Sequence, residues 1–152
     1  MLTTSDLYFA AQAGIMRRIS AIKKIRSEPF GTPKDDLWGI DIESCIAEYL
    51  VAKTFDSAWI PYRDNPKEIE ADVGENIQVR STNLQHGSLI LHKEDKDDHV
   101  FVLVIGQNLN KRIAGWVRGI DGKIESFWQV KTGRPCYFVP QSCLHPVEDF
   151  FL

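Results

Sequence analysis

The chain has 152 residues, 43% of them hydrophobic and 26% charged, which predicts a single globular domain over residues 1–152. A formal net charge of −3 argues against a surface coated for nucleic acid, since phosphate-backbone binding needs clustered lysine and arginine. No apolar run is long enough to span a bilayer, and three cysteines without a CxxC pair argue against a disulfide framework and for buried thiols. We therefore expect a cytoplasmic protein without a membrane partner.

Two helices are predicted in the first third of the chain. The first lies within residues 1–30, where Thr3, Thr4 or Ser5 caps it and isoleucines recur at spacings of four and three before the turn-forming segment EPFGTP. The second extends from about residue 41 to 55. Its apolar residues recur at i, i+3, i+4, i+7 and i+8, as Ile42, Cys45, Ile46, Tyr49 and Leu50.

Short β-rich runs follow one another from residue 58 onward, separated by clusters of glycine, asparagine and aspartate. The runs are AWIPY, IEADV, IQVRST, SLILH, HVFVLVIG, RIAGWVRG and CYFVP. Helices followed by consecutive strands predict an α+β fold, in which a mixed β-sheet has flanking helices. The segment DGKIESFWQVKTG matches neither period well enough to be assigned.

The stretch ADVGENIQVRST sets polar residues around a tight turn. A three-residue hairpin loop at residues 74–76, with glycine or asparagine in the left-handed conformation, places Asp72 opposite Gln78. Because side chains alternate along a strand, Gln78 and Arg80 point to one face and the apolar residues beside them point to the core. The pattern fits an ordinary half-exposed hairpin, and it also fits a site where three polar groups converge.

At these residues the sequence resembles the PD-(D/E)xK nuclease superfamily, in which an aspartate is followed on the next strand by (Asp/Glu/Gln)-x-Lys. Here Asp72 precedes QVR, and glutamine in the middle position resembles Mrr-like restriction nucleases. The preceding IESCIAEYLVAKTFDSAWIPY is similar to the superfamily's helix-then-strand segment, whose helix usually carries a glutamate. By its place in AEYLVAK, Glu48 matches that glutamate best and Glu43 second, and helical periodicity does not separate them.

The pattern also resembles small phage-encoded members of the superfamily. The later pieces that carry this likeness are DKDDHVFVLVIG, AGWVRG and YFVPQSCL. The resemblance extends from about residue 43 to 144, and it implies a restriction-endonuclease-like core over residues 40–144. The activity that it implies is metal-dependent hydrolysis of phosphodiester bonds in DNA, by an endonuclease or an exonuclease.

That chemistry requires a hard divalent cation, Mg²⁺ or Mn²⁺, held by oxygen ligands. The resemblance implies two carboxylates and one backbone carbonyl as metal ligands, from Asp72, from Glu48 or Glu43, and from Val79. Gln78 would complete the site through its amide oxygen, without adding charge. Arg80 stands in the lysine position, where a guanidinium that stays protonated can hold the scissile phosphate but cannot act as a base.

The alternative is a nuclease-fold protein that cuts nothing and binds nucleic acid or a protein partner. The basic segment MRRISAIKKIR supplies the nucleic-acid-binding candidates Arg17, Arg18, Lys24 and Arg26, and a solvated helix face is the competing interpretation. A homodimer would serve the first function, since a small nuclease needs two copies to cut both strands. The acidic segment HKEDKDDH is predicted to be a charged, solvated hairpin end.

Overall fold

The computed structural model describes residues 1–24, 36–62, 70–130 and 133–152. Two long helices come first, α1 (Thr4–Lys23) and α2 (Leu37–Thr54). The strands are β1 (Ile77–Thr82), β2 (Leu89–Leu91), β3 (Val100–Ile105), β4 (Arg112–Arg118), β5 (Trp128–Gln129) and β6 (Cys136–Val139), with the short helix α3 (Gly119–Gly122) after β4. The short 3-10 helices are Asn108–Asn110, Glu125–Phe127, Gln141–Cys143 and Val147–Phe151. The predicted α+β class is confirmed.

The strands form two sheets, where the sequence predicted one. In the first sheet β3 lies between β1, to which it is parallel, and β4, to which it is antiparallel. In the second sheet β6 pairs antiparallel with both β2 and β5. Isolated pairings of Val73 with Trp59 and with Ile77 continue the first sheet beyond β1. Of the expected strand IEADV, the part before residue 70 lies outside the described residues.

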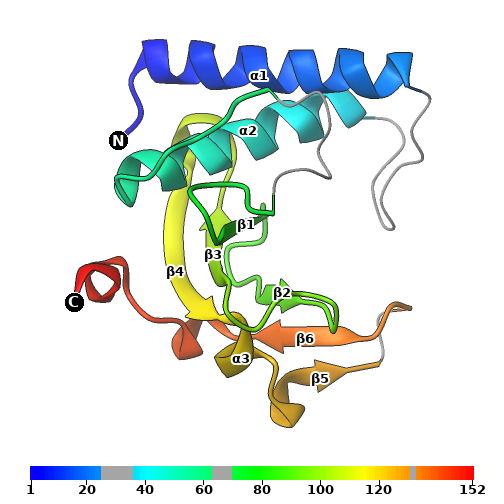
Figure 1. Ribbon diagram of the computed structural model, residues 1–152, viewed down its shortest axis with the longest axis vertical. Coiled ribbons are helices and arrows are strands. Elements are labelled where there is room, and N and C mark those ends of the chain that lie inside the picture. Colours follow the sequence, from blue (N-terminus) through cyan, green and yellow to red (C-terminus); the bar gives the residue numbers. More distant parts are fainter. Residues whose placement is uncertain (25–35, 63–69, 131–132) are drawn as a thin grey trace.

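The elements stack in layers, with α1 on α2, α2 on one face of the β1–β3–β4 sheet, and the second sheet toward the other face (Figure 1). Strand β3 is buried along its whole length because alternate side chains enter different clusters. Val100, Val102 and Val104 pack with residues of α2. Phe101, Leu103 and Ile105 pack with residues of the second sheet. The predicted flanking helices therefore cover only one face.

Helix α1 begins with a capping box and packs on α2 through small residues. The Thr3 hydroxyl accepts a hydrogen bond from the Asp6 N–H, and the Asp6 carboxylate accepts one from the Thr3 N–H. Ala10, Ala13 and Gly14 are buried against α2. A Cβ atom on Gly14 would lie 2.5 Å from the Ile42 Cα, so only glycine fits this crossing. The isoleucines that predicted the helix lie on its exposed side.

The predicted hairpin loop at residues 74–76 is confirmed. Val73 and Ile77 pair antiparallel, and each N–H donates to the other's carbonyl at 3.1 Å. Gly74 takes the left-handed conformation, with φ of 58°. Ile77 and Val79 pack into the core beneath α2, as the alternation along the strand predicted. The opposite face of β1 therefore carries Gln78 and Arg80.

Two remaining sequence expectations concern the cysteines and the membrane. Cys45 and Cys136 are buried as expected, whereas Cys143 is exposed, and none of the three forms a disulfide. Within the described ranges, no helix is both long enough and apolar enough to cross a bilayer.

A substitution at Gly14 tests the close crossing of α1 and α2. We expect Gly14→Val to lower the free energy of unfolding by about 1 to 3 kcal/mol, because the added carbons overlap the α2 backbone. Chemical denaturation followed by circular dichroism measures this. Lys23→Val changes an exposed position of the same helix and is expected to have a much smaller effect. Equal effects of the two variants would contradict the observed crossing.

Candidate functional site

Glu48 lies in the middle of α2 and is only 7% exposed. The Arg17 guanidinium of α1 donates two hydrogen bonds to it, from Nη1 to Oε1 at 2.8 Å and from Nη2 to Oε2 at 2.7 Å. Trp59 Nε1 donates a further bond to Oε2 at 2.8 Å, and Arg17 Nε donates to the Pro61 carbonyl at 3.1 Å. Both carboxylate oxygens of Glu48 are therefore engaged by donors from the same protein.

The contact with Glu48 stabilises the positive charge of Arg17. Burial acts to lower the pKa of the guanidinium, but its hydrogen bonds and attraction to Glu48 outweigh burial and raise the pKa above its ordinary value. Asp72 adds a further contribution in the same direction, so its carboxylate lies within electrostatic reach of Arg17. Two of the three acids that the sequence suggested as metal ligands, Glu48 and Asp72, thus act on one guanidinium.

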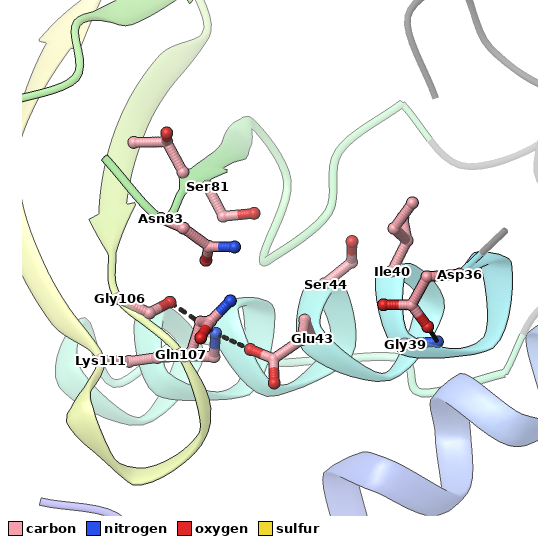
Figure 2. Close-up of a pocket in the computed structure, with 11 residues that line it drawn as sticks. Asp36, Gly39, Ile40, Glu43, Ser44, Ser81, Asn83, Gly106, Gln107 and Lys111 are labelled. Carbon is pink, nitrogen blue, oxygen red and sulfur yellow. Dashed lines mark hydrogen bonds and ion pairs between the residues drawn. The ribbon is translucent and has the colours of Figure 1, made fainter. Parts of the chain in front are cut away.

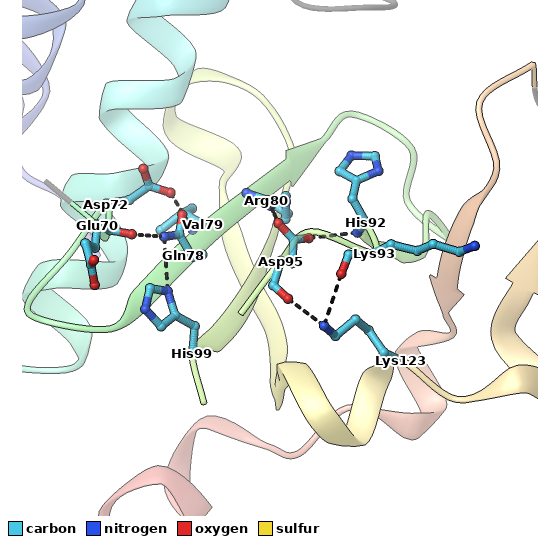
Figure 3. Close-up of polar contacts among 10 residues, drawn as sticks. All are labelled: Glu70, Asp72, Gln78, Val79, Arg80, His92, Lys93, Asp95, His99 and Lys123. Atoms are coloured by element: carbon cyan, nitrogen blue, oxygen red, sulfur yellow. Dashed lines mark hydrogen bonds and ion pairs between the residues drawn. The ribbon is translucent and has the colours of Figure 1, made fainter. Parts of the chain in front are cut away.

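Asp72 is positioned by the hairpin at the start of β1. Its N–H donates to the Ile77 carbonyl at 3.0 Å, and its Oδ2 accepts a hydrogen bond from the Val79 N–H at 2.8 Å (Figure 3). One edge of strand β1 pairs with β3, and its other edge has no partner strand at Val79 among the described residues. The Asp72 carboxylate therefore supplies the hydrogen-bond acceptor for the Val79 N–H on that open edge. The contact gives Asp72 a structural role independent of any cation.

Gln78 and Arg80 project from the face of β1 opposite to Val79 and α2. Gln78 Nε2 donates to the Glu70 carbonyl at 2.5 Å and lies 3.3 Å from His99 Nδ1 (Figure 3). Arg80 Nη2 donates to Asp95 Oδ1 at 3.0 Å.

The Arg80 guanidinium also lies 5.3 Å from the centre of the Phe101 ring, in the core cluster on the side of the second sheet. The structure therefore brings Glu48, Asp72 and Val79 to one side of β1, and it does not bring Gln78 or Arg80 to that side.

The acidic segment at residues 92–99 is largely exposed, as predicted, but it connects strands of different sheets and is not a hairpin end. Asp95 is its partly buried acid. Its Oδ2 accepts a hydrogen bond from the His92 N–H at 2.8 Å, while Oδ1 binds Arg80. Lys123 donates to the Asp95 carbonyl at 2.5 Å and forms an ion pair with Asp97. Within the described ranges, no group of three His, Cys, Asp or Glu side chains is arranged to hold a metal ion.

Glu43, the second candidate for the helix acid, lies elsewhere. It faces a pocket of about 240 Å³ between α2 and the ends of β1 and β3, whose lining includes Ser44, Asn83 and Gln107 (Figure 2). Its carboxylate accepts hydrogen bonds from the Lys111 ammonium and, at 3.3 Å, from the Asn108 N–H. The Lys111 side chain is almost completely buried, so Glu43 is the counter-ion of an internal lysine.

The four nucleic-acid-binding candidates do not form one basic surface among the described residues. Arg17 is directed to Glu48, and Arg18 is 4% exposed with its guanidinium 3.3 Å from an Asp41 carboxylate oxygen. Lys24 is exposed at the end of α1. Arg26 lies outside the described residues.

Sequence reasoning missed three partners: Arg17 for Glu48, Trp59 for Glu48, and Asp95 for Arg80. A signal for the first exists, because Ala10, Ala13 and Gly14 mark the face of α1 that meets α2, and Arg17 follows them by one helical turn. The second and third join residues 11 and 15 positions apart that lie in different elements, and we find no local signal for them.

Comparison with known proteins does not assign the chain to a family. No family model matches the chain, and it has no match among curated proteins or solved structures.

The Arg17–Glu48 contact can be measured as a coupling free energy. In a double-mutant cycle of Arg17→Gln and Glu48→Gln, we expect a coupling of about 1 to 3 kcal/mol, because either single change leaves a partly buried charge without its partner. Denaturant unfolding of the four proteins gives this value. The exposed Lys53–Asp6 pair also joins α1 to α2, and its cycle serves as a control with a smaller coupling. A coupling near zero for Arg17 and Glu48 would contradict a stabilising contact between these two side chains.

Proposed function

We propose that the chain is a nuclease-fold protein that cuts nothing and works by binding a partner protein. The observation that carries this proposal is the paired hydrogen bonding of Arg17 to Glu48. An acid that a nuclease would use for its cation is instead neutralised by an arginine of the same chain.

A divalent cation of the Mg²⁺ type prefers several hard oxygen ligands. The Glu48 and Asp72 carboxylates are of the right kind, but both oxygens of Glu48 already accept hydrogen bonds. The Arg17 guanidinium also brings a positive charge to the place where the cation would bind, and like charges repel strongly at short range. As these side chains stand, they do not fit a divalent cation.

The division of β1 into two faces supports the same conclusion. A phosphate held near Glu48 lies on the side of α2, whereas Arg80 extends to the other side and binds Asp95. Gln78 is likewise turned to the Glu70 carbonyl and His99. The groups of the resembled motif therefore do not act together on one phosphate.

The order of elements nevertheless supports a restriction-endonuclease-like core. The helix that carries Glu48 is followed by paired segments at Trp59 and Val73 and then by β1. Strand β1 is parallel to its neighbour β3, with a crossover connection between them. A fold of this class serves proteins that cut and proteins that only bind.

A protein partner fits the surface better than a nucleic acid. Phosphate binding depends on clustered cations, and two of the candidate arginines are turned toward acids inside the molecule. The outer side of α1 instead exposes apolar side chains, among them Tyr8, Ile15 and Ile22. Contiguous exposed apolar surface is typical of protein-binding faces.

A metal-dependent DNA nuclease is the second candidate, and one observation favours it. The charges of Glu48 and Asp72 both act on Arg17, and the Val79 N–H faces Asp72. In a strand the N–H and C=O of one residue point to the same side, so the Val79 carbonyl faces this edge too. If Arg17 left Glu48, two carboxylates and one carbonyl would face the same space.

The two candidates are separated by assaying the purified chain with linear, single-stranded and supercoiled DNA in Mg²⁺ or Mn²⁺. We expect no cleavage, no gel shift at physiological salt and no calorimetric signal for metal, because Arg17 neutralises Glu48. Metal-dependent cleavage that Asp72→Asn abolishes would contradict the proposal and establish the nuclease.

Arg17→Gln extends this test, because it removes the charge beside Glu48. Lys23→Gln is the matched control, since it removes a positive charge from the exposed end of the same helix. Gain of Mn²⁺ binding in the first variant and not in the second would identify Arg17 as the group that occupies the cation's place. A gel shift that high salt abolishes would favour nucleic acid as the partner.

A further inference from the structure

The outer side of α1 carries a continuous apolar surface, which we name the α1 stripe. Its members are Tyr8, Phe9, Ile15, Met16, Ile19 and Ile22. Their exposed fractions range from 37% for Ile19 to 67% for Tyr8. Helix α1 lies on the side of α2 away from the sheet, so the stripe is at the outside of the layered structure (Figure 1). A large exposed apolar surface of this kind usually marks a site of protein–protein contact.

The spacing of the stripe is that of a helix-pairing seam. Tyr8, Ile15 and Ile22 are separated by seven residues, and Ile19 falls between the last two at spacings of four and three. This is the a/d pattern of a coiled coil, extended over two heptads, with Gln12 as the polar member of the same seam. Met16 widens the seam along one border, and Phe9 lies at that border with its ring also in contact with Tyr49 of α2 and with Trp59. A pattern of this kind is typical of packing against another helix.

The stripe has no charge of its own. Between residues 8 and 22, all of which the structure describes, the charged residues are Arg17 and Arg18, and these bind Glu48 and Asp41 on the side of α2. The exposed cations nearest to the stripe, Lys23 and Lys24, lie at its C-terminal end, so a phosphate or an acidic peptide would find no cluster of cations along it. A second apolar helix would meet no unpaired charge.

We propose that the stripe binds a second copy of this chain, as an antiparallel pair of α1 helices around a two-fold axis at Ile15. This inference rests on the proposed function, that the chain works by binding a protein, and it identifies that partner. A two-fold interface must be self-complementary, so that residue i meets residue j and j meets i. The residue numbers of the stripe satisfy this condition.

With Ile15 on the axis, pairs whose numbers sum to about 30 meet across the interface. Tyr8 meets Ile22 of the partner subunit, and Gln12 lies near Ile19 of the partner subunit. Ile15 meets Ile15 of the partner subunit. Every apolar member on the seam then has an apolar neighbour, apart from the contact that involves Gln12. One polar residue in such a seam is known to fix register in helix pairs.

Charge selects the antiparallel direction. Lys23 and Lys24 are exposed at the C-terminal end of α1. In a parallel pair these lysines of both copies would lie side by side and repel, whereas in an antiparallel pair they lie at opposite ends. Antiparallel helices also place the positive end of one macrodipole next to the negative end of the other.

The area is sufficient for a weak specific dimer. The stripe extends over about 21 Å of helix at 1.5 Å per residue. Six large apolar side chains that are about half exposed offer roughly 500 Å² per copy, or roughly 1,000 Å² in total, which is the lower limit of specific interfaces. We therefore expect a dissociation constant in the micromolar range.

The test is analytical ultracentrifugation of the full chain over a concentration series. The wild-type chain is expected to pass from monomer to dimer, and Ile15→Glu or Ile19→Glu to raise the dissociation constant at least about tenfold. Ile120→Glu and Ile124→Glu place the same charge on exposed apolar residues in and just after α3, on the other side of the molecule from α1, and are expected to change nothing (Figure 1). Far-UV circular dichroism verifies that each variant is folded. A wild-type chain that stays monomeric, or controls as disruptive as the α1 variants, would overturn the proposal.

A charge exchange tests the antiparallel register. Tyr8→Lys and Ile22→Glu should each weaken the dimer, and the double variant should recover association, because each lysine then faces a glutamate of the partner subunit. A parallel pair would place like charges together and make the double variant the weakest. That result would overturn the antiparallel register. Cleavage or gel-shift activity would refute the proposed function instead, so the two failures are distinguishable.

Discussion

Two parallel hydrogen bonds between the Arg17 guanidinium and the Glu48 carboxylate join α1 to α2 and determine what the rest of the site can do. The pair is largely buried, so its charges must satisfy each other, and Trp59 completes the acid's hydrogen bonding from a third segment. Gly14 permits the crossing that brings Arg17 within reach. A helix interface and a buried acid whose two oxygens already accept hydrogen bonds are thus consequences of one contact.

The alternation of side chains along β1 is the second constraint. Val79 faces α2 and the Asp72 edge, while Gln78 and Arg80 face the opposite side, where Asp95 of the segment between β2 and β3 binds the guanidinium. On that opposite side the Arg80 guanidinium lies over the Phe101 ring beside the second sheet, and Gln78 binds the Glu70 carbonyl and contacts His99. The same strand that resembles a nuclease motif in sequence therefore distributes its polar groups to two environments.

Much of the fold was predictable because local patterns determine it. The two helices, the loop at residues 74–76 and the alternation along β1 follow from periodicity, capping and turn chemistry, and the structure confirms them. The division into two sheets was not predictable, since β2, β5 and β6 are short and find their partners far along the chain. The role of Arg17 was missed because α1 carries large apolar residues on one side and small residues on the other. Periodicity alone does not tell which of these two sides is buried. The small residues Ala10, Ala13 and Gly14 indicate which side meets α2, but they do not identify Glu48, 31 residues away, as the partner of Arg17.

The most direct test of this account is nuclear magnetic resonance of the Arg17 side chain. The account predicts that its guanidinium N–H signals exchange slowly with water, because they are held by Glu48 and the Pro61 carbonyl, and that millimolar Mg²⁺ leaves them unchanged. Loss or displacement of these signals on adding Mg²⁺, together with broadening by Mn²⁺ centred on Glu48 and Asp72, would contradict it.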